Sequence, residues 1–175
     1  MKKETLNKLV LSAMFLAIGM VLPSVTMQIR EIGNMLLPMH IPVMLCGVIC
    51  GPLYGGVIGI ILPVLRSLIF TMPRLYPNAV AMAVELCVYG VVIGIVYMYT
   101  KKLKGGIFIS LITAMLAGRI IWGITISALT VIAGGAYTWE MYFSRAFVEA
   151  VPGIIIQFIL IPAVILSLKK AKILK

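Results

Sequence analysis

Long apolar runs alternate along the chain with short polar segments, and each run has the length of a membrane-crossing helix. Such a helix needs roughly 20 largely apolar residues. Clustered lysines and Gly-Pro, Gly-Gly or Met-Pro-Arg segments separate the runs. The pattern predicts an all-α integral membrane protein, with residues 1–175 forming one transmembrane domain. Its six-transmembrane-helix bundle would use spans over about 8–25, 35–51, 54–71, 77–100, 106–132 and 143–168.

The composition supports a membrane-embedded class. Of the 175 residues, 62% are hydrophobic and only 11% are charged, whereas soluble globular domains carry about 25% charged residues. Too few polar side chains are present to cover a water-facing surface. We therefore expect the lipid bilayer to surround most of the chain.

The net charge of +10 follows from how lysine is distributed. All ten lysines lie near the N-terminus, in the segment 101–104, or near the C-terminus. Cytoplasmic loops of membrane proteins are enriched in Lys and Arg, and six crossings place these three segments on one side. We predict a multi-pass protein of the cell membrane with both termini in the cytoplasm. Nucleic acid is not an expected partner.

Few residues suited to catalysis or metal binding are present. The chain has no aspartate, one histidine and three cysteines. One histidine cannot build a multi-histidine metal site, and no phosphate-binding loop for ATP occurs in the sequence. We expect no catalytic residues, no metal and no cofactor, and any energy that the protein uses would come from a partner or a gradient.

Arginines, four of the five glutamates and His40 map mainly to the half opposite the lysines. An ionisable group inside a membrane span costs at least about 2.5–3.5 kcal/mol at the centre, and it therefore indicates a functional site. We interpret this set as the lining of a small-molecule cavity open to the outside. The candidate substrate-binding residues are Asn34, His40, Arg66, Arg74, Tyr76, Asn78, Glu85, Arg119, Trp122, Arg145 and Glu149.

Internal ion pairing is the alternative explanation for the same residues. Arg145 and Glu149 are four residues apart on one expected helix, and Glu85 has arginines of other spans as candidate partners.

The spacing of seven between Asn78 and Glu85 corresponds to about two helical turns on one face. Arg74 above and the carboxylate of Glu85 below would hold a polar ligand at its two ends, with Asn78 between them.

Several segments together resemble the substrate-binding (S) components of energy-coupling factor (ECF) transporters. They are the lysine-bearing N-terminus leading into LSAMFLA at 11–17, then LPMHIP at 37–42 before the glycines of 47–59, and MPRLYP at 72–77 before a glutamate-bearing span. The subgroup that looks most similar is that of the pantothenate and related vitamin carriers.

The resemblance implies a six-helix bundle that binds one water-soluble vitamin or precursor in a pocket closed by outer loops. It also implies a membrane coupling subunit and two cytoplasmic ATPase subunits as partners. Ala13 and Ala17 match the small-residue face that contacts the coupling subunit in this family. Pantothenate would suit arginine together with Asn78 and Tyr76, whereas pyridoxine or hydroxymethylpyrimidine would use Glu85 and stacking on Trp122 or Tyr76.

Two other classes of function stay open. A structural or assembly subunit without a ligand predicts that the polar residues neutralise one another and that the cavity is absent. A membrane-embedded enzyme would use Glu85, His40 and Arg119 as acid, base and anion-binding group. Motifs such as Gly-x-Ser-x-Gly or His-Glu-x-x-His are absent from the sequence, and nothing in it fixes a nucleophile.

Overall fold

Helices form the regular secondary structure of the described part of this computed structural model. The structure describes residues 3–26, 37–136, 138–144 and 150–171. The all-α class is confirmed, because the described residues contain no strand. The long helices are α1 (Lys3–Thr26), α4 (Pro52–Phe70), α5 (Val80–Thr100), α6 (Gly106–Ile132) and α8 (Val151–Lys170). Between them lie α3 (His40–Ile49), α7 (Trp139–Phe143) and a π-helical turn, η1 (Leu75–Ala79).

The outer surface of the bundle is apolar. In the described chain, five helices are long and apolar enough to cross a membrane. Aliphatic side chains project outward from them, including Leu68, Ile124 and Ile159, which are 66%, 62% and 66% exposed. Large apolar surfaces are unfavourable in water but suit contact with lipid tails. The protein is therefore an integral membrane protein, as predicted.

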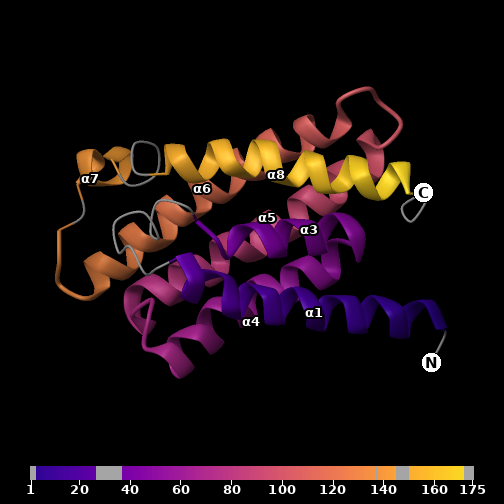
Figure 1. Ribbon diagram of the computed structural model, residues 1–175. Coiled ribbons are helices and arrows are strands. Elements are labelled where there is room, and N and C mark those ends of the chain that lie inside the picture. The colour runs from indigo at the N-terminus through magenta and orange to yellow at the C-terminus, as the bar shows by residue number, and fades with distance from the viewer. Residues whose placement is uncertain (1–2, 27–36, 137, 145–149, 172–175) are drawn as a thin grey trace.

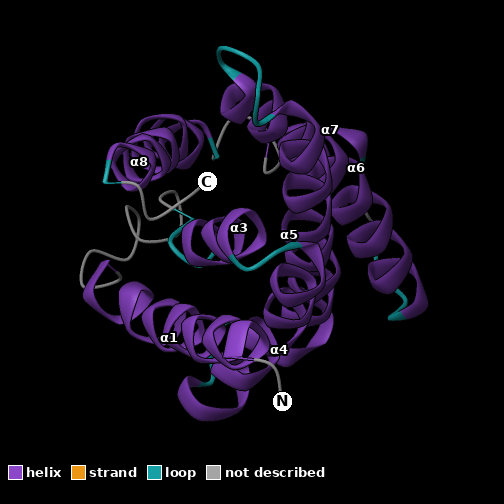
Figure 2. Cartoon of the chain, turned by 90° about the vertical axis from the view of Figure 1, so that its right-hand side faces the viewer, coloured by secondary structure: helices purple, strands orange, loops and turns teal. Residues whose placement is uncertain are grey.

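The second expected span, 35–51, differs most from the structure. Its helix α3 has 10 residues, about 15 Å of helix, which is half the roughly 30 Å of a hydrocarbon core. Nine of these residues, 40–48, are buried. Figure 2 shows α3 at the centre of the bundle, and it contacts α1, α4, α5 and α8. Because protein encloses α3, its length is not set by the thickness of the bilayer.

Two other spans begin later than predicted. α5 begins at Val80 rather than 77, because Leu75–Ala79 forms a π-helical turn in which Tyr76 is extended (φ −118°, ψ 134°). The following Pro77 disfavours helical backbone at the residue before it. α8 begins at Val151 rather than 143, and the separate helix α7 covers Trp139–Phe143.

Glycines bring α3, α4 and α5 into backbone contact. A Cβ atom at Gly55 would lie 2.6 Å from the Cα of Gly47, and one at Gly94 would lie 2.7 Å from the carbonyl oxygen of Gly47. Real side chains do not fit at such distances, so only glycine allows these helices to approach as they do. The glycine repeat thus serves internal packing.

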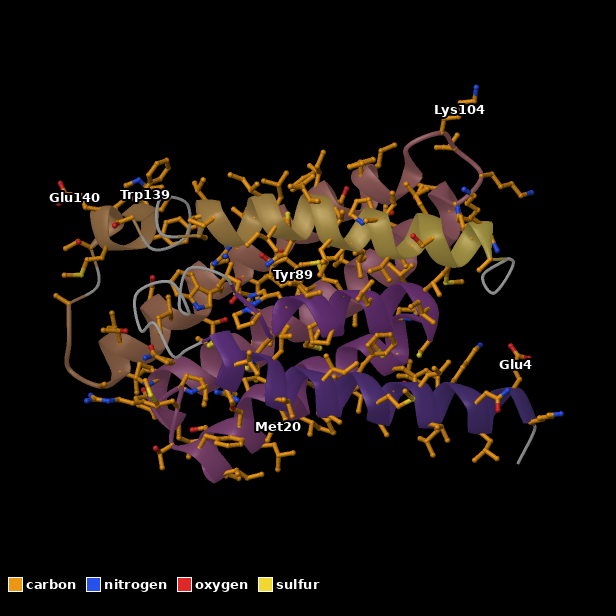
Figure 3. The ribbon with its side chains drawn as sticks, viewed as in Figure 1. Glu4, Met20, Tyr89, Lys104, Trp139 and Glu140 are labelled. Atoms are coloured by element: carbon orange, nitrogen blue, oxygen red, sulfur yellow. The ribbon has the colours of Figure 1, made fainter. Side chains whose placement is uncertain are left out.

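The three lysine-rich segments lie at one end of the bundle. Figure 1 shows both chain ends and the loop after α5 at this end, and α7 at the other. Figure 3 likewise places Glu4 and Lys104 at the end opposite Trp139. Lys169 of α8 donates a hydrogen bond to the carbonyl oxygen of Lys101 at 3.3 Å. The arrangement agrees with an even number of crossings between the segments, while the side of the membrane they face stays a prediction.

Candidate functional site

Three ionisable side chains from three helices meet inside the bundle. Oε1 of Glu85 on α5 lies 3.3 Å from Nη1 of Arg119 on α6 and 3.6 Å from Nε2 of His40 on α3. The exposed fractions of Glu85, Arg119 and His40 are 2%, 6% and 1%. The Tyr89 ring meets the His40 ring edge-on at 5.1 Å. We call these four residues the buried cluster, and Figure 3 labels Tyr89 at its position in the bundle.

The buried cluster keeps unused hydrogen-bonding capacity. Nδ1 of His40 and both Nε and Nη2 of Arg119 have no hydrogen-bond partner among the described residues. Buried polar atoms are almost always hydrogen-bonded, and leaving one unpaired costs about 1–3 kcal/mol. The cluster therefore has polar atoms suited to a bound ligand or to water.

His40 also lines a cavity at the end of the bundle opposite the lysine-rich segments. The volume of this cavity is about 340 Å³, within the range of about 300–1,000 Å³ of small-molecule sites. Both Arg74 and Asn78 lie on its wall with exposed side chains. The cavity, called the substrate cavity below, is lined by Pro23, Leu37, Pro38, Met39, His40, Met72, Pro73, Arg74, Asn78 and Met82.

Glu85 was predicted to lie at the inner end of the ligand, and its contact with a ligand stays a prediction. Glu85 contacts His40 and Arg119 but is not among the residues that line the substrate cavity. In the structure Glu85 pairs with Arg119, an arginine of another span, as the alternative prediction proposed. Arg74, Asn78 and His40 are the candidates that the fold brings to one cavity.

Two further candidates bind backbone carbonyls outside the substrate cavity. Nη1 of Arg66, a residue that is 3% exposed, donates to the carbonyl oxygen of Met20 at 2.6 Å. This bond links α4 to α1 three residues before Pro23, which lies inside α1. The hydroxyl of Tyr76 donates to the carbonyl oxygen of Leu129 at 2.6 Å.

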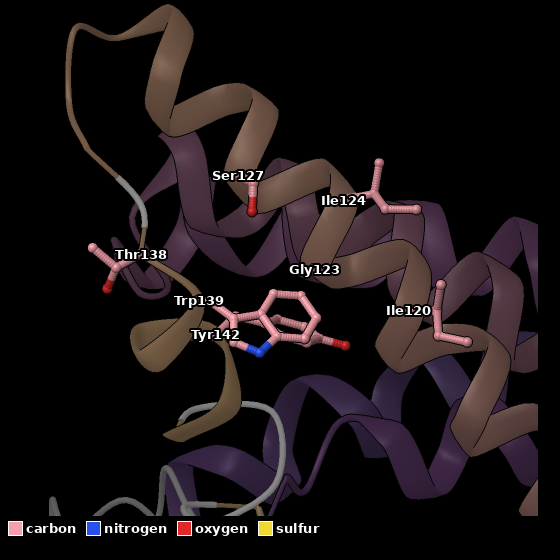
Figure 4. A pocket seen from close by; sticks show the side chains of 7 residues that line it. All are labelled: Ile120, Gly123, Ile124, Ser127, Thr138, Trp139 and Tyr142. Carbon is pink, nitrogen blue, oxygen red and sulfur yellow. The ribbon is translucent and has the colours of Figure 1, made fainter.

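A second cavity of about 510 Å³ lies between α6 and α7. Figure 4 shows Trp139 and Tyr142 of α7 beside the segment of α6 that contains Gly123. The candidate Trp122 stacks on Tyr142, with ring centroids 6.4 Å apart. Its described lining contains no charged side chain and consists of Ile120, Gly123, Ile124, Ser127, Thr138, Trp139 and Tyr142. Judged by their described linings, the substrate cavity is the better suited of the two to an ionic ligand.

Comparison with known proteins links these features to a transport family. A family model described as ECF transporter, substrate-specific component matches residues 7–165. The chain belongs to this family. No curated protein and no solved structure matches it. The matched residues include all the residues that form the buried cluster and the substrate cavity, and the resemblance noted in the sequence is confirmed at the level of the family.

In this S component, Ala13 and Ala17 lie on the outer surface of α1. Both are exposed, whereas Ser12 and Gly19 of the same helix are buried against the bundle. A groove of about 330 Å³ runs beside Ala13 between α1 and α4. Outward-facing small residues leave room for the close approach of another helix, so the geometry is compatible with the predicted partner contact.

One buried polar residue of this S component was missed by the sequence-based prediction. Gln157 of α8 is 1% exposed, and its Nε2 has no hydrogen-bond partner within the described ranges. α8 contacts α3 and α6, the helices that carry His40 and Arg119. The signal for it was available, because Gln157 is the one polar residue in the apolar run 151–166.

Three candidate residues fall outside the described residues. They are Asn34, Arg145 and Glu149. Their predicted contribution to the site, and the predicted ion pair between Arg145 and Glu149, stay predictions.

Proposed function

We propose that this S component binds one small water-soluble vitamin or vitamin precursor with high affinity and takes part in its import across the cell membrane. The observation that supports this function is the substrate cavity, where Arg74, Asn78 and His40 meet at the end opposite the lysine-rich segments. Pantothenate is the first candidate substrate. Pyridoxine and hydroxymethylpyrimidine are the next.

The residues of the substrate cavity offer three kinds of contact. Arg74 forms charge-assisted hydrogen bonds to an acidic group, and Asn78 both donates and accepts hydrogen bonds. Methionine side chains adapt their shape to a ligand, and Met39, Met72 and Met82 all line the cavity. A molecule that carries a carboxylate, hydroxyl groups and a short carbon chain, such as pantothenate, would make all three kinds of contact.

The proposed partners are a membrane coupling subunit and two cytoplasmic ATPase subunits. Ala13 and Ala17, exposed on α1, are the proposed contact with the coupling subunit. The ATPase subunits would supply the energy for release of the substrate into the cell. In this arrangement the S component itself needs no catalytic residue and no cofactor.

A structural subunit without a ligand is the second candidate, and the Glu85–Arg119 pair favours it. It accounts less well for Arg74, which lines a cavity and pairs with no carboxylate of the described residues. A membrane-embedded enzyme is not proposed, because Glu85 contacts both Arg119 and His40 and the family is that of a transport component.

Calorimetric titration tests the proposed function. The purified chain in detergent would be titrated in turn with pantothenate, pyridoxine and hydroxymethylpyrimidine. Saturable binding of one compound at one site per chain is expected. The absence of binding by all three, in protein that also carries no small molecule after purification, would contradict the proposal.

A further inference from the structure

We propose that the substrate is a small organic anion whose acidic group binds at the N-terminus of α3, between His40 and Arg74. This inference rests on the proposed function. It adds the charge class of the substrate and the position of its ionic group, both of which the sequence left open.

The first observation is where α3 begins. The helix starts at His40, and the preceding residues Leu37, Pro38 and Met39 all line the substrate cavity. The N-terminus of a helix carries a partial positive charge and attracts anions. No side chain caps this end of α3. The backbone N–H of His40 donates to the carbonyl oxygen of Leu37 at 3.1 Å, and Pro42 has no N–H, so the attraction of this end for an anion comes mainly from the helix dipole.

The second observation is independent and concerns the His40 side chain. It is 1% exposed, it lines the cavity, and neither ring nitrogen has a hydrogen-bond partner among the described residues. Nε2 lies 3.6 Å from the Glu85 carboxylate, beyond hydrogen-bond length. A buried imidazole of this kind beside a helix N-terminus has an N–H donor to offer to an anion.

The third observation is the balance of charge. The Glu85 carboxylate lies 3.3 Å from Arg119 and is therefore compensated inside the protein. The described wall of the cavity contains no acidic residue, whereas Arg74 contributes a positive charge. A cationic ligand would meet no counter-charge among the described residues of this wall. An anion would meet both Arg74 and the positive end of α3.

The rest of the wall indicates that the anion carries a carbon body. Three methionines and three prolines, at positions 39, 72, 82, 23, 38 and 73, line the same cavity of about 340 Å³. Burying apolar surface against them contributes about 25 cal/mol per Å². An inorganic anion would gain none of this stabilisation, so an organic acid fits better than free phosphate.

Fractionated yeast extract tests the charge class even while the substrate itself is unidentified. The extract is passed over a quaternary-ammonium resin at neutral pH, and the thermal unfolding of the purified full chain is measured with the unbound and the salt-eluted, desalted fractions. We expect stabilisation by the eluted, anionic fraction. For Arg74→Gln, the concentration of this fraction that gives half of the maximal rise in unfolding temperature should be at least tenfold higher than for the wild type. Lys104→Gln, at the opposite end of the bundle, should respond like the wild type.

Different results would contradict the anionic class of the substrate and the proposed substrate-binding function. Stabilisation by the unbound fraction alone would overturn the anionic class while leaving the proposed function in place. No stabilisation by either fraction, in protein that carries no small molecule after purification, would overturn both. Where pantothenate stabilises the chain, panthenol, which replaces the carboxylate by a hydroxymethyl group, should do so at least tenfold more weakly. Equal potency of the two would overturn the inference.

Discussion

The carboxylate of Glu85 lies 3.3 Å from the guanidinium of Arg119 and joins α5 to α6 inside the bundle. Both side chains are buried, so water screens their attraction only weakly. Removing one partner of a buried ion pair costs about 3–5 kcal/mol, because the other charge is left unpaired. This pair, together with His40, fixes the relative positions of three helices behind the substrate cavity.

Double-mutant analysis should show that Glu85 and Arg119 act together. Glu85→Gln and Arg119→Gln should each lower the unfolding temperature of the purified protein. The free energy of unfolding that the double variant loses should be smaller than the sum of the losses in the two single variants. We expect a coupling of about 0.5–3 kcal/mol, measured by reversible unfolding in mixed micelles. Glu140→Gln, on the exposed surface of α7, is the control and should have little effect. Additive losses would show that the pair is not coupled.

Backbone contact between helices should make one glycine of α4 far less replaceable than its neighbour. Gly55→Ala and Gly56→Ala gain the same helix propensity, about 1 kcal/mol. A Cβ at Gly55 meets the backbone of Gly47 at 2.6 Å, whereas a Cβ at Gly56 meets a side-chain methyl group of Val91 at 2.6 Å. Side chains shift more readily than backbone, so Gly55→Ala should be the less stable variant by about 1–3 kcal/mol. Equal stability of the two in thermal unfolding would argue against this packing.

Bulky residues on the outer face of α1 should separate transport from binding. Ala13→Trp or Ala17→Trp would hinder close approach of a partner helix but leave the substrate cavity untouched, because α1 contributes Pro23 to its wall and neither alanine. Uptake of radiolabelled substrate by cells should fall at least tenfold, with unchanged affinity in the purified chain. Ala163→Trp on the exposed side of α8 serves as the control. Parallel loss of binding and uptake would mean that the alanines serve internal packing.

The lysine-rich end of the bundle should face the cytoplasm. In intact cells, a membrane-impermeant thiol reagent should label Glu140→Cys but not Leu103→Cys, because positively charged loops stay on the cytoplasmic side. Wild-type protein supplies the background, since Cys46 and Cys50 are buried and Cys87 is half-buried. Labelling at position 103 from outside, without labelling at position 140, would invert the topology and the proposed direction of transport.

The elements of this fold were largely predictable, because apolar runs and their breaks are local signals. The run 106–132 and the helix α6 have the same bounds. The run 35–51 was predicted as a full span, yet its helix covers 10 residues at the centre of the bundle. Apolar sequence looks alike whether lipid or protein surrounds it, so composition alone does not distinguish a spanning helix from a buried one.

The candidate site was predictable in its residue types and less so in its contacts. Prolines around Arg74 marked a constrained segment, and Asn78 follows directly, so these two could be placed together. The contact of His40 with Glu85 depends instead on how two helices are rotated and shifted against each other, which a single sequence does not encode in any local pattern. Gln157, by contrast, could have been singled out from the sequence, because it is the one polar residue in the apolar run 151–166.

The small molecule carried by the purified protein tests the central claim most directly. Protein isolated in mild detergent is denatured, and the released compounds are quantified by mass spectrometry for the wild type, for Arg74→Ala with Asn78→Ala, and for Lys104→Ala as control. Losing a charged hydrogen bond costs about 1.5–3 kcal/mol, or roughly ten- to a hundredfold in affinity. The account predicts one organic acid, close to one per chain, in the wild type and the control, and at least a tenfold depletion in the double variant. The absence of any enriched compound, or equal amounts in all three proteins, would contradict it.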